Sequence, residues 1–312
     1  MTSIREIDIE RDAPSLTALV REITHTAVVS VESTIHRLRS VPDRAQAKGW
    51  VAVVEGEVAG RVEVWRNFFT MGSRSVFVNV AVFPEHRRRG IGTALWSRGA
   101  ERAAAIGAET LLTSFHENDA GTAFATRLGF ALARAEAEAV VDPRTVTELP
   151  RGDLQLVAVR DADPLLVWQV DLEATLDMPQ SEPVDTIPYD EWVAHVLGHP
   201  LFSADGSFVA MVDGTAAAVS LVTADLESGR AHNMFTGTLR AYRGRGLARA
   251  VKLASLRWAR EHGIITMATH NDETNATMLA INRGLGYRPA GRRVEWLRAG
   301  TASSRAPRAP AP

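Results

Sequence analysis

The stretch of sequence that decides the fold occurs twice. It reads VFVNVAVFPEHRRRGIG over residues 76–92 and HNMFTGTLRAYRGRGLA over residues 232–248. In each copy a β-rich segment leads into the pattern Arg-x-x-Gly-x-Gly/Ala, and the two copies lie 156 residues apart. Because a fixed offset between similar segments is the signature of a repeat, this spacing indicates a tandem duplication.

A second pair of landmarks supports the duplication. Asn118 lies eleven residues before Gly129, and Asn275 lies eleven residues before Gly286, which gives an offset of 157. At roughly 100–200 residues per domain, the length of 312 residues also fits two domains. Two independent motifs with nearly the same offset are not explained by chance, and they indicate that one unit was duplicated.

Each half repeats the same predicted order of elements around its glycine turn. A strand precedes the turn and an amphipathic helix follows it; a strand, a helix and a closing strand come next. In the second half Leu247, Val251, Ala254 and Trp258 recur at helical spacing and predict a buried stripe. The expected division is a first domain over residues 1–141, a linker over 142–153, a second domain over 154–298 and a disordered tail over 299–312.

The composition excludes several classes of protein. The chain is 46% hydrophobic and 23% charged, as soluble globular proteins are, and its formal net charge of −2 gives no electrostatic reason to expect a nucleic-acid partner. The absence of cysteine excludes disulfides, thiolate zinc sites and a cysteinyl-enzyme intermediate. His195 and His199 have helical spacing but no evident third ligand, so we expect no metal site.

The sequence also bears on location. Residues 1–6 show no signal-peptide pattern, and no apolar run approaches the roughly 20 residues that span a bilayer. We therefore expect a cytoplasmic protein without a membrane partner. Lysine occurs only at Lys48 and Lys252, and the richness in arginine and alanine hints at a GC-rich bacterial source.

A strand that enters a glycine-rich turn and opens a helix is an anion-binding arrangement. Glycine lets the backbone approach a ligand closely, and the helix start offers unpaired N–H donors at the positive end of its dipole. Two familiar phosphate motifs do not fit, because these turns lack both Gly-Lys-Ser/Thr and Gly-x-Gly-x-x-Gly. The alternative interpretation is a tight strand-to-helix turn with solvated arginines, and the repetition of the turn argues against it.

Taken together, these motifs resemble the GNAT superfamily of N-acetyltransferases over about residues 1–140 and 154–298. The second half is especially similar to the tandem acetyltransferases of actinobacteria, the mycothiol synthases among them. The resemblance implies an α/β fold of two tandem domains, each with a mixed, mostly antiparallel central sheet flanked by helices. It also implies acetyl-CoA as the acyl donor.

The resemblance assigns residues of each half to acetyl-CoA. They share three positions: the strand beside the pantetheine arm, the turn around the pyrophosphate, and an asparagine next to the arm. In the first half these residues are Val80, Val82, Arg87, Arg88, Arg89, Gly90, Ile91, Gly92 and Asn118. In the second half they are Thr236, Thr238, Arg243, Gly244, Arg245, Gly246, Leu247, Ala248 and Asn275.

The resemblance further implies a general base eleven residues before the turn motif, where members commonly carry glutamate or histidine. The second half has His232 at this position, whereas the first half has Val76, which cannot titrate. An imidazole with an ordinary pKa of about 6.5 suits a base that works near neutral pH. Other carboxylates near the segments expected to face the acceptor remain alternatives: Glu63, Glu173, Asp177 and Asp225.

The sequence departs from the family at the usual general acid. A tyrosine is expected seven residues after the motif asparagine, but Ala125 and Asn282 stand there. Asn282 is therefore a second catalytic candidate that could bond the sulfur or the substrate while water supplies the proton; alternatively it only anchors its helix.

The sequence therefore predicts an enzyme, an acyl-CoA-dependent N-acyltransferase. We expect it to acetylate the primary amine of a small molecule by direct attack in a ternary complex, with the second half as the catalytic one. One alternative is transfer to the amine of a cysteinyl pseudodisaccharide, as in mycothiol synthases. Another is a non-catalytic CoA-binding or regulatory module, which the missing tyrosine suggests.

Overall fold

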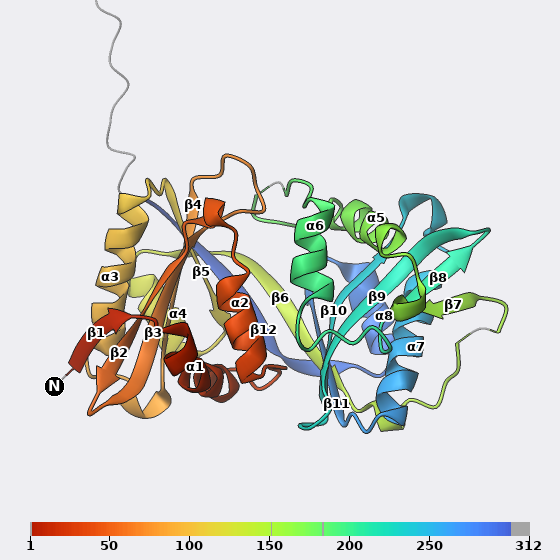
Figure 1. The fold of residues 1–312 in the computed structure, drawn as a ribbon, viewed down its shortest axis with the longest axis horizontal. Coiled ribbons are helices and arrows are strands. Elements are labelled where there is room, and N and C mark those ends of the chain that lie inside the picture. The colour runs from red at the N-terminus through yellow and green to blue at the C-terminus, as the bar shows by residue number, and fades with distance from the viewer. Residues whose placement is uncertain (1, 151, 183, 301–312) are drawn as a thin grey trace, which may run out of the picture. The chain divides into compact units, whose positions relative to one another are not determined.

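The computed structural model describes residues 2–150, 152–182 and 184–300, and they form two compact units (Figure 1). Within the described residues, unit 1 comprises residues 2–23, 41–134 and 294–300, and unit 2 comprises residues 24–40, 152–182 and 184–293 together with residues 135–150. Most of the predicted tail, residues 301–312, lies outside the described residues.

Unit 1 is a mixed, mostly antiparallel sheet flanked by helices, in the strand order β1-β2-β3-β4-β5-β12. The pair β4–β5 is parallel. The strands are β1 (Thr2–Glu6), β2 (Lys48–Val54), β3 (Glu57–Arg66), β4 (Ser75–Val82), β5 (Thr110–His116) and the end of β12 (Arg288–Ala299). The helices are α1 (Ile9–Ile23), α3 (Ile91–Ala105) and α4 (Asp119–Arg127).

Unit 2 repeats this plan in the order β6-β11-β10-β9-β8-β7, with β10–β11 as its parallel pair. Its strands are β6 (Ala131–Val141), β7 (Gln155–Ala158), β8 (Phe208–Val212), β9 (Thr215–Asp225), β10 (Arg230–Thr238) and β11 (Thr266–Asp272). Its helices are α2 (Val31–Arg39), α5 (Pro164–Thr175), α6 (Tyr189–Trp192), α7 (Leu247–Glu261) and α8 (Ala276–Gly284).

The two halves of the sequence exchange segments between the units. Residues 135–141 of β6 lie in unit 2, where they pair antiparallel with β11, and residues 294–299 of β12 lie in unit 1. The Arg298 guanidinium stacks there on the rings of Trp96 and Phe130, at 5.1 and 5.2 Å. The compact units thus differ from the continuous stretches proposed from the sequence, because two similar halves can supply each other's closing strand.

The predicted helical stripe forms part of the core of unit 2. Leu247, Val251, Ala254 and Trp258 are all buried on α7, as their spacing predicts. In unit 1 the corresponding helix α3 packs so closely on the sheet that a Cβ built on Gly99 would lie 2.7 Å from Val78 Cγ1. No helix in the described part of the chain is long and apolar enough to cross a membrane.

The close packing of α3 gives a stability prediction. Gly99→Ala should destabilise the protein by about 1–3 kcal/mol, because stiff valine side chains must shift to admit the methyl group. Gly92→Ala, in the same helix with no contact under 3.7 Å, is the matched control and should leave stability equal or higher. Chemical denaturation of both variants measures the difference, and equal midpoints would contradict the packing argument.

Candidate active site

The two glycine turns have the same backbone geometry. Gly90 and Gly246 stand directly before α3 and α7 in the left-handed region, with φ of 80° and 78°, and neither helix has a side-chain cap. Gly244 (φ 77°) is matched in unit 1 by Arg88, which adopts φ 63° although it is not glycine. The first N–H groups of both helices are therefore available to an anion.

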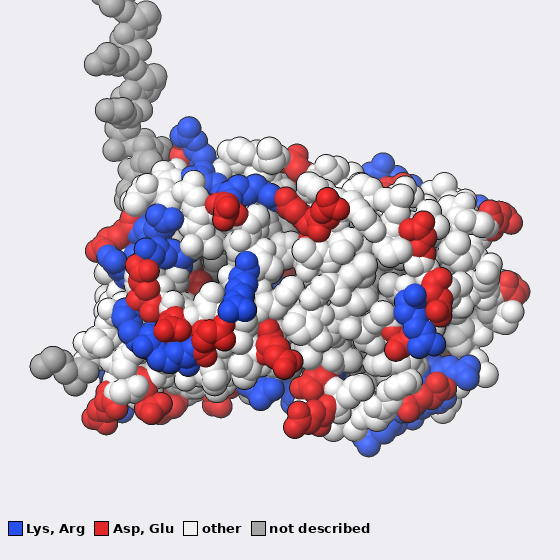
Figure 2. Space-filling view, in the orientation of Figure 1, with Lys and Arg blue, Asp and Glu red and all other residues white. Residues whose placement is uncertain are grey.

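The arginines beside the turns are mostly engaged with the protein itself. Arg87 Nε donates to Val82 O at 3.1 Å, and Arg243 Nε donates to Thr238 O at 3.2 Å, so both copies keep the same brace. Arg245 lies over the ring of Tyr242 at 5.1 Å. The backbone amides of the turns are thus better placed for a phosphate than these side chains. Figure 2 shows basic and acidic side chains interspersed on the visible face, rather than gathered into one basic patch.

Two carboxylates, Glu173 of α5 and Asp177 of the loop after it, hold the second glycine turn by hydrogen bonds. Asp177 accepts hydrogen bonds from Arg240 Nε at 2.8 Å and from Arg243 Nη2 at 2.5 Å, and these bonds hold the pKa of its carboxyl well below the usual range. Glu173 Oε1 accepts from Arg240 N at 2.7 Å. Two of the alternative base candidates therefore serve the turn, while a third, Glu63, is ion-paired with Arg61.

The motif asparagines cap helices. Asn118 Oδ1 accepts from Gly121 N at 2.9 Å at the start of α4, and Asn275 Oδ1 accepts from Met278 N at 3.1 Å at the start of α8. Asparagine is among the best N-cap residues, which explains their place at equal spacing in both halves. Their contact with a pantetheine arm remains a prediction.

The parallel strands of each unit pair only at their beginnings. In unit 2 the ladder covers Arg230–Asn233 of β10 with Thr266–Thr269 of β11, although β10 continues to Thr238. In unit 1 it covers Ser75–Phe77 of β4. The predicted pantetheine strands, with Thr236 in unit 2 and Val80 in unit 1, follow the end of each ladder. A ligand arm requires such unpaired backbone.

The two units differ beyond the end of the ladder. In unit 2 the β9–β10 register shifts between Asn233 and Phe235, which marks a β-bulge. In unit 1 the β3–β4 register is continuous. There Asn79 Oδ1 accepts from Ser114 N at 3.0 Å, so a side chain bridges β4 and β5 where the ladder has ended.

His232 occupies the paired part of β10, immediately before the bulge, and is partly buried. Its Nε2 lies 3.0 Å from Nδ1 of His270 on β11, and the two rings are nearly parallel. His270 Nε2 in turn lies 4.0 Å from Glu136 Oε2 on β6. Burial, aided by the positive charges of nearby groups, lowers the pKa of His232 well below its usual value. The imidazole is therefore neutral at pH 7 and able to accept a proton.

The corresponding position in unit 1 is apolar. The extra residue of the bulge shifts the match expected from the sequence by one, because Phe77 pairs with Leu112 as His232 pairs with Ala268. Neither Phe77 nor the fully buried Val76 beside it can titrate. Glu136 was missed by the sequence reasoning, because only the exchange of β6 brings it beside β11.

Asn282, the other catalytic candidate, ties α8 to β11. Its Nδ2 donates to Asn271 Oδ1 at 2.6 Å, and the residue is almost fully buried. Its Oδ1 atom has no hydrogen-bond partner among the described residues. The observed bond supports the anchoring role, and the catalytic role remains a prediction.

A buried lysine is the other residue that the sequence did not single out. Lys252 on α7 is 1% exposed, and its Nζ donates to Asn233 Oδ1. Burial lowers the pKa of this lysine to about 7. No local pattern marks it, because a single charge on an amphipathic helix is ordinarily solvated.

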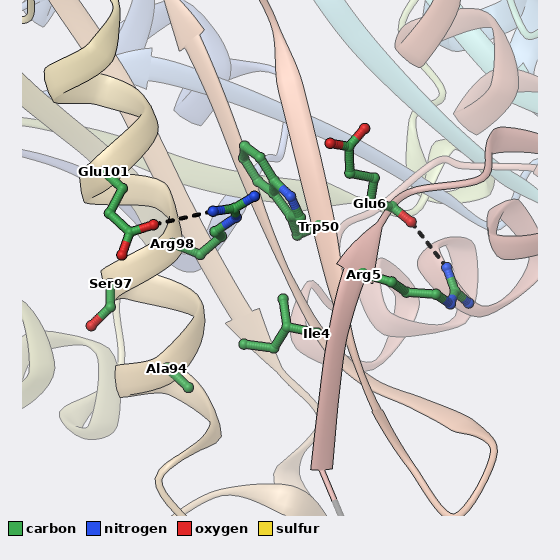
Figure 3. Close-up of a pocket in the computed structure, with 8 residues that line it drawn as sticks. All are labelled: Ile4, Arg5, Glu6, Trp50, Ala94, Ser97, Arg98 and Glu101. Carbon is green, nitrogen blue, oxygen red and sulfur yellow. Dashed lines mark hydrogen bonds and ion pairs between the residues drawn. The ribbon is translucent and has the colours of Figure 1, made fainter.

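A hollow in unit 1 lies apart from these residues (Figure 3). It is bordered by β1, β2 and α3, with Arg98 stacked on the Trp50 ring at 5.0 Å. Its lining consists of Ile4, Arg5, Glu6, Trp50, Ala94, Ser97, Arg98 and Glu101. None of these is a predicted site residue. Within the described residues, no group of three or more histidines or carboxylates is arranged to hold a metal.

The fold and the paired glycine turns define a tandem acetyltransferase architecture, and comparison with known proteins gives the same result. The family model described as "Acetyltransferase (GNAT) family" matches residues 18–130 and 170–287. The chain therefore belongs to the GNAT acetyltransferase family.

Individual relatives are more distant. The chain is 28% identical over 231 residues to a mycothiol acetyltransferase of Frankia casuarinae; the match covers 67% of this chain and 64% of that protein, less than two thirds of its length. A tandem GNAT protein from the clavulanic acid biosynthesis pathway superposes with a TM-score of 0.74 at 22% identity, covering 96% and 99% of the two chains. A GCN5-related N-acetyltransferase from Sphaerobacter thermophilus gives 0.71 at 18% identity, covering 96% and 95%.

The buried lysine predicts a pH dependence of stability. Because the pKa of Lys252 is about 7 in the folded chain and ordinary in the unfolded chain, the unfolded state binds more protons between pH 7 and pH 10. The free energy of unfolding should therefore rise with pH in this range, by about 1 kcal/mol per pH unit from this group.

Urea unfolding at several pH values tests this expectation by comparing wild type with Lys252→Met. The variant should lose the rise, so the difference between the two proteins should change with pH. Parallel stability curves would contradict the assignment.

Proposed function

We propose that the chain is an acetyl-CoA-dependent N-acetyltransferase that acetylates an amine of a small molecule by direct attack, with unit 2 as the catalytic unit. One observation carries the proposal: His232 lies beside the end of a parallel ladder, on a bulged strand that leads to the uncapped start of α7. Along β10 the proposed base His232 is thus followed by the part of the strand that no longer pairs with β11, and then by the glycine turn that would bind an anion.

The residues of unit 2 fit the proposed donor. The N–H groups at the start of α7, with the turn over residues 244–248, suit a pyrophosphate. Thr238 Oγ1, on the diverging part of β10, is buried and has no hydrogen-bond partner among the described residues, so a polar ligand atom would satisfy it. Acetyl-CoA would supply the thioester whose carbonyl the amine attacks; the C–S bond would break as the amide forms, and the coenzyme A thiolate would take its proton from water.

His232 would take the proton of the attacking amine. The carboxylate of Glu136, 4.0 Å from His270 Nε2, favours the His270 tautomer that carries its proton on Nε2. Nδ1 of His270 then accepts from His232 Nε2–H, and the lone pair on His232 Nδ1 is left for the acceptor amine. The parallel contact of the two rings fixes the orientation of the base. We assign Asn282 to holding α8 against β11.

Unit 1 would have a different role. It keeps the glycine turn, but Phe77 stands where unit 2 has His232, and Asn79 bridges the strands where the pantetheine arm would pass. We infer that any coenzyme A bound there does not react.

A cysteinyl pseudodisaccharide amine is the second candidate acceptor. It is favoured by the similarity to the mycothiol acetyltransferase of Frankia casuarinae. Including such an amine in the acceptor panel separates it from simpler amines. Binding of coenzyme A without turnover on any amine would favour the regulatory module instead.

Replacement of the base should abolish most of the activity. His232→Ala should lower kcat with the best amine by about 10²–10⁴-fold, the usual contribution of general acid–base catalysis. His116→Ala, at the end of β5 in unit 1, is the control and should retain activity. A thiol-release assay with acetyl-CoA measures both, and unchanged turnover in His232→Ala would refute the choice of base.

The number of donor sites can be counted directly. Native mass spectrometry should find one tightly held coenzyme A per chain, because the first unit's strands are bridged. Gly246→Glu should remove it, since a carboxylate at the turn repels the pyrophosphate, whereas Gly90→Glu should not. Two tightly bound molecules, or loss only in the Gly90 variant, would contradict the division of roles.

A further inference from the structure

A polar network lies inside the core of unit 2, between α7 and the sheet. Its side chains come from β9, β10 and α7, and all are at most 3% exposed: Ser220, Asn233, Lys252 and Ser255. The Ser220 and Ser255 hydroxyls lie 3.1 Å apart, and Asn233 Nδ2 donates to Ser220 Oγ at 2.8 Å. The mechanism proposed for His232 uses none of these side chains.

The amide of Asn233 holds the bulge of β10 in shape. Its Nδ2 donates across the bulge to Phe235 O at 3.2 Å, and its Oδ1 accepts from Thr236 Oγ1 at 2.9 Å. Its backbone carbonyl accepts from Thr269 Oγ1 on β11 at 3.3 Å. One side chain therefore connects the last paired residue of the ladder to both residues that follow the bulge.

Lys252 and two backbone carbonyls together fix which way that amide points. Asn233 Nδ2 donates to Leu221 O at 3.3 Å as well as to Phe235 O, and the ammonium form of Lys252, which only donates, meets Asn233 Oδ1. The oxygen is thereby turned toward α7 and the NH₂ group toward β9 and Phe235 O. The Tyr287 ring, 5.2 Å from Nζ, covers the other side of the lysine. Burying a lysine is unfavourable unless its charge is paired. If this position only had to fill space in the core, an apolar side chain would serve better.

The first half of the chain supplies an internal comparison. The bulge adds one residue to β10, so the two parallel ladders match Asn233 with Val78 of β4, while the helices α7 and α3 match Lys252 with Trp96; both counterparts are apolar. Unit 1, which lacks the polar pair, also lacks the bulge, because its β3–β4 register is unbroken over Val76–Val82 of β4. The lysine, the asparagine and the bulge are thus present together in one copy and absent together from the described residues of the other.

We propose that Lys252 is a positioning residue for acetyl transfer: it orients the amide of Asn233 and so fixes the bulge that sets His232 and the diverging part of β10. The link to catalysis rests on the function proposed above, whereas the link to the bulge does not. Lys252 bonds to β10 at Asn233 rather than at His232 or at the predicted donor residues Thr236 and Thr238, so its effect on the reaction is indirect.

Three variants of the full chain test the proposal. Lys252→Met keeps the length of the side chain and removes the donor. Lys252→Gln restores a donor that can meet Asn233 Oδ1. Leu253→Met changes a neighbouring buried side chain on α7 without touching the network and serves as the control.

The first measurement is hydrogen exchange of peptides that cover β10, made without ligand. In Lys252→Met the amides of residues 234–238 should exchange about tenfold faster while the rest of unit 2 keeps its protection, and Lys252→Gln should recover most of the protection. Unchanged exchange in Lys252→Met would overturn the proposal. If Lys252→Met fails to fold, Lys252→Gln is compared with Leu253→Met: equal protection of residues 234–238 supports the donor role of residue 252, and faster exchange in the Gln variant alone would contradict it.

The second measurement is steady-state kinetics with acetyl-CoA and the best amine. Lys252→Met should lower kcat by about tenfold with a smaller change in KM, because the reacting groups are displaced more than the turn that binds the donor. Lys252→Gln should recover much of kcat. Equal kcat in Lys252→Met and wild type would overturn the catalytic part. Wild type without activity on any amine would refute the proposed function alone, and the exchange data would still test the bulge.

Discussion

The parallel ladder of unit 2 stops after Asn233 and Thr269, and the arrangement of the candidate site depends on where it stops. Two parallel strands that separate leave backbone groups unpaired, and such groups need a ligand, water or another part of the chain. The bulge begins at the last rung, His232 lies just before it, and the strand continues into the glycine turn. The end of the ladder, the candidate base His232 and the start of the glycine turn therefore follow one another along a single strand.

The two copies show how much divergence one architecture tolerates. Both keep the glycine turn, the arginine brace to the preceding strand and the asparagine cap. These features depend on backbone geometry, which a duplicated fold inherits as a unit. The residues His232, Asn233 and Lys252 have the apolar counterparts Phe77, Val78 and Trp96. One copy can thus fill with apolar side chains the space in which the other keeps a polar network, because either solution satisfies a buried position.

The sequence predicted the elements well where the signal was local. A strand precedes each glycine turn and a helix follows it, as expected: β4 (Ser75–Val82) and α3 (Ile91–Ala105) in the first half, β10 and α7 in the second. The choice of His232 as base came from the family resemblance and stays a prediction. The contribution of Glu136 and the exchange of the closing strands could not be predicted, because two similar halves offer equivalent pairing partners. The role proposed for Lys252 could not be predicted from the sequence, because no local pattern connects it to its partner Asn233 on another element.

The exchange of closing strands has a consequence for biosynthesis. Unit 1 draws residues 294–300 from the very end of its described chain, and Gly300 N donates to Glu109 O at 2.7 Å. Residues 294–300 are translated after all the described residues of unit 2, so the sheet of unit 1 can be completed only once unit 2 has been made. Such long sequence separation slows folding. The β5 edge of unit 1 therefore stays unpaired until the second half has been made. If the two halves were expressed as separate chains, each would lack the closing strand of its sheet.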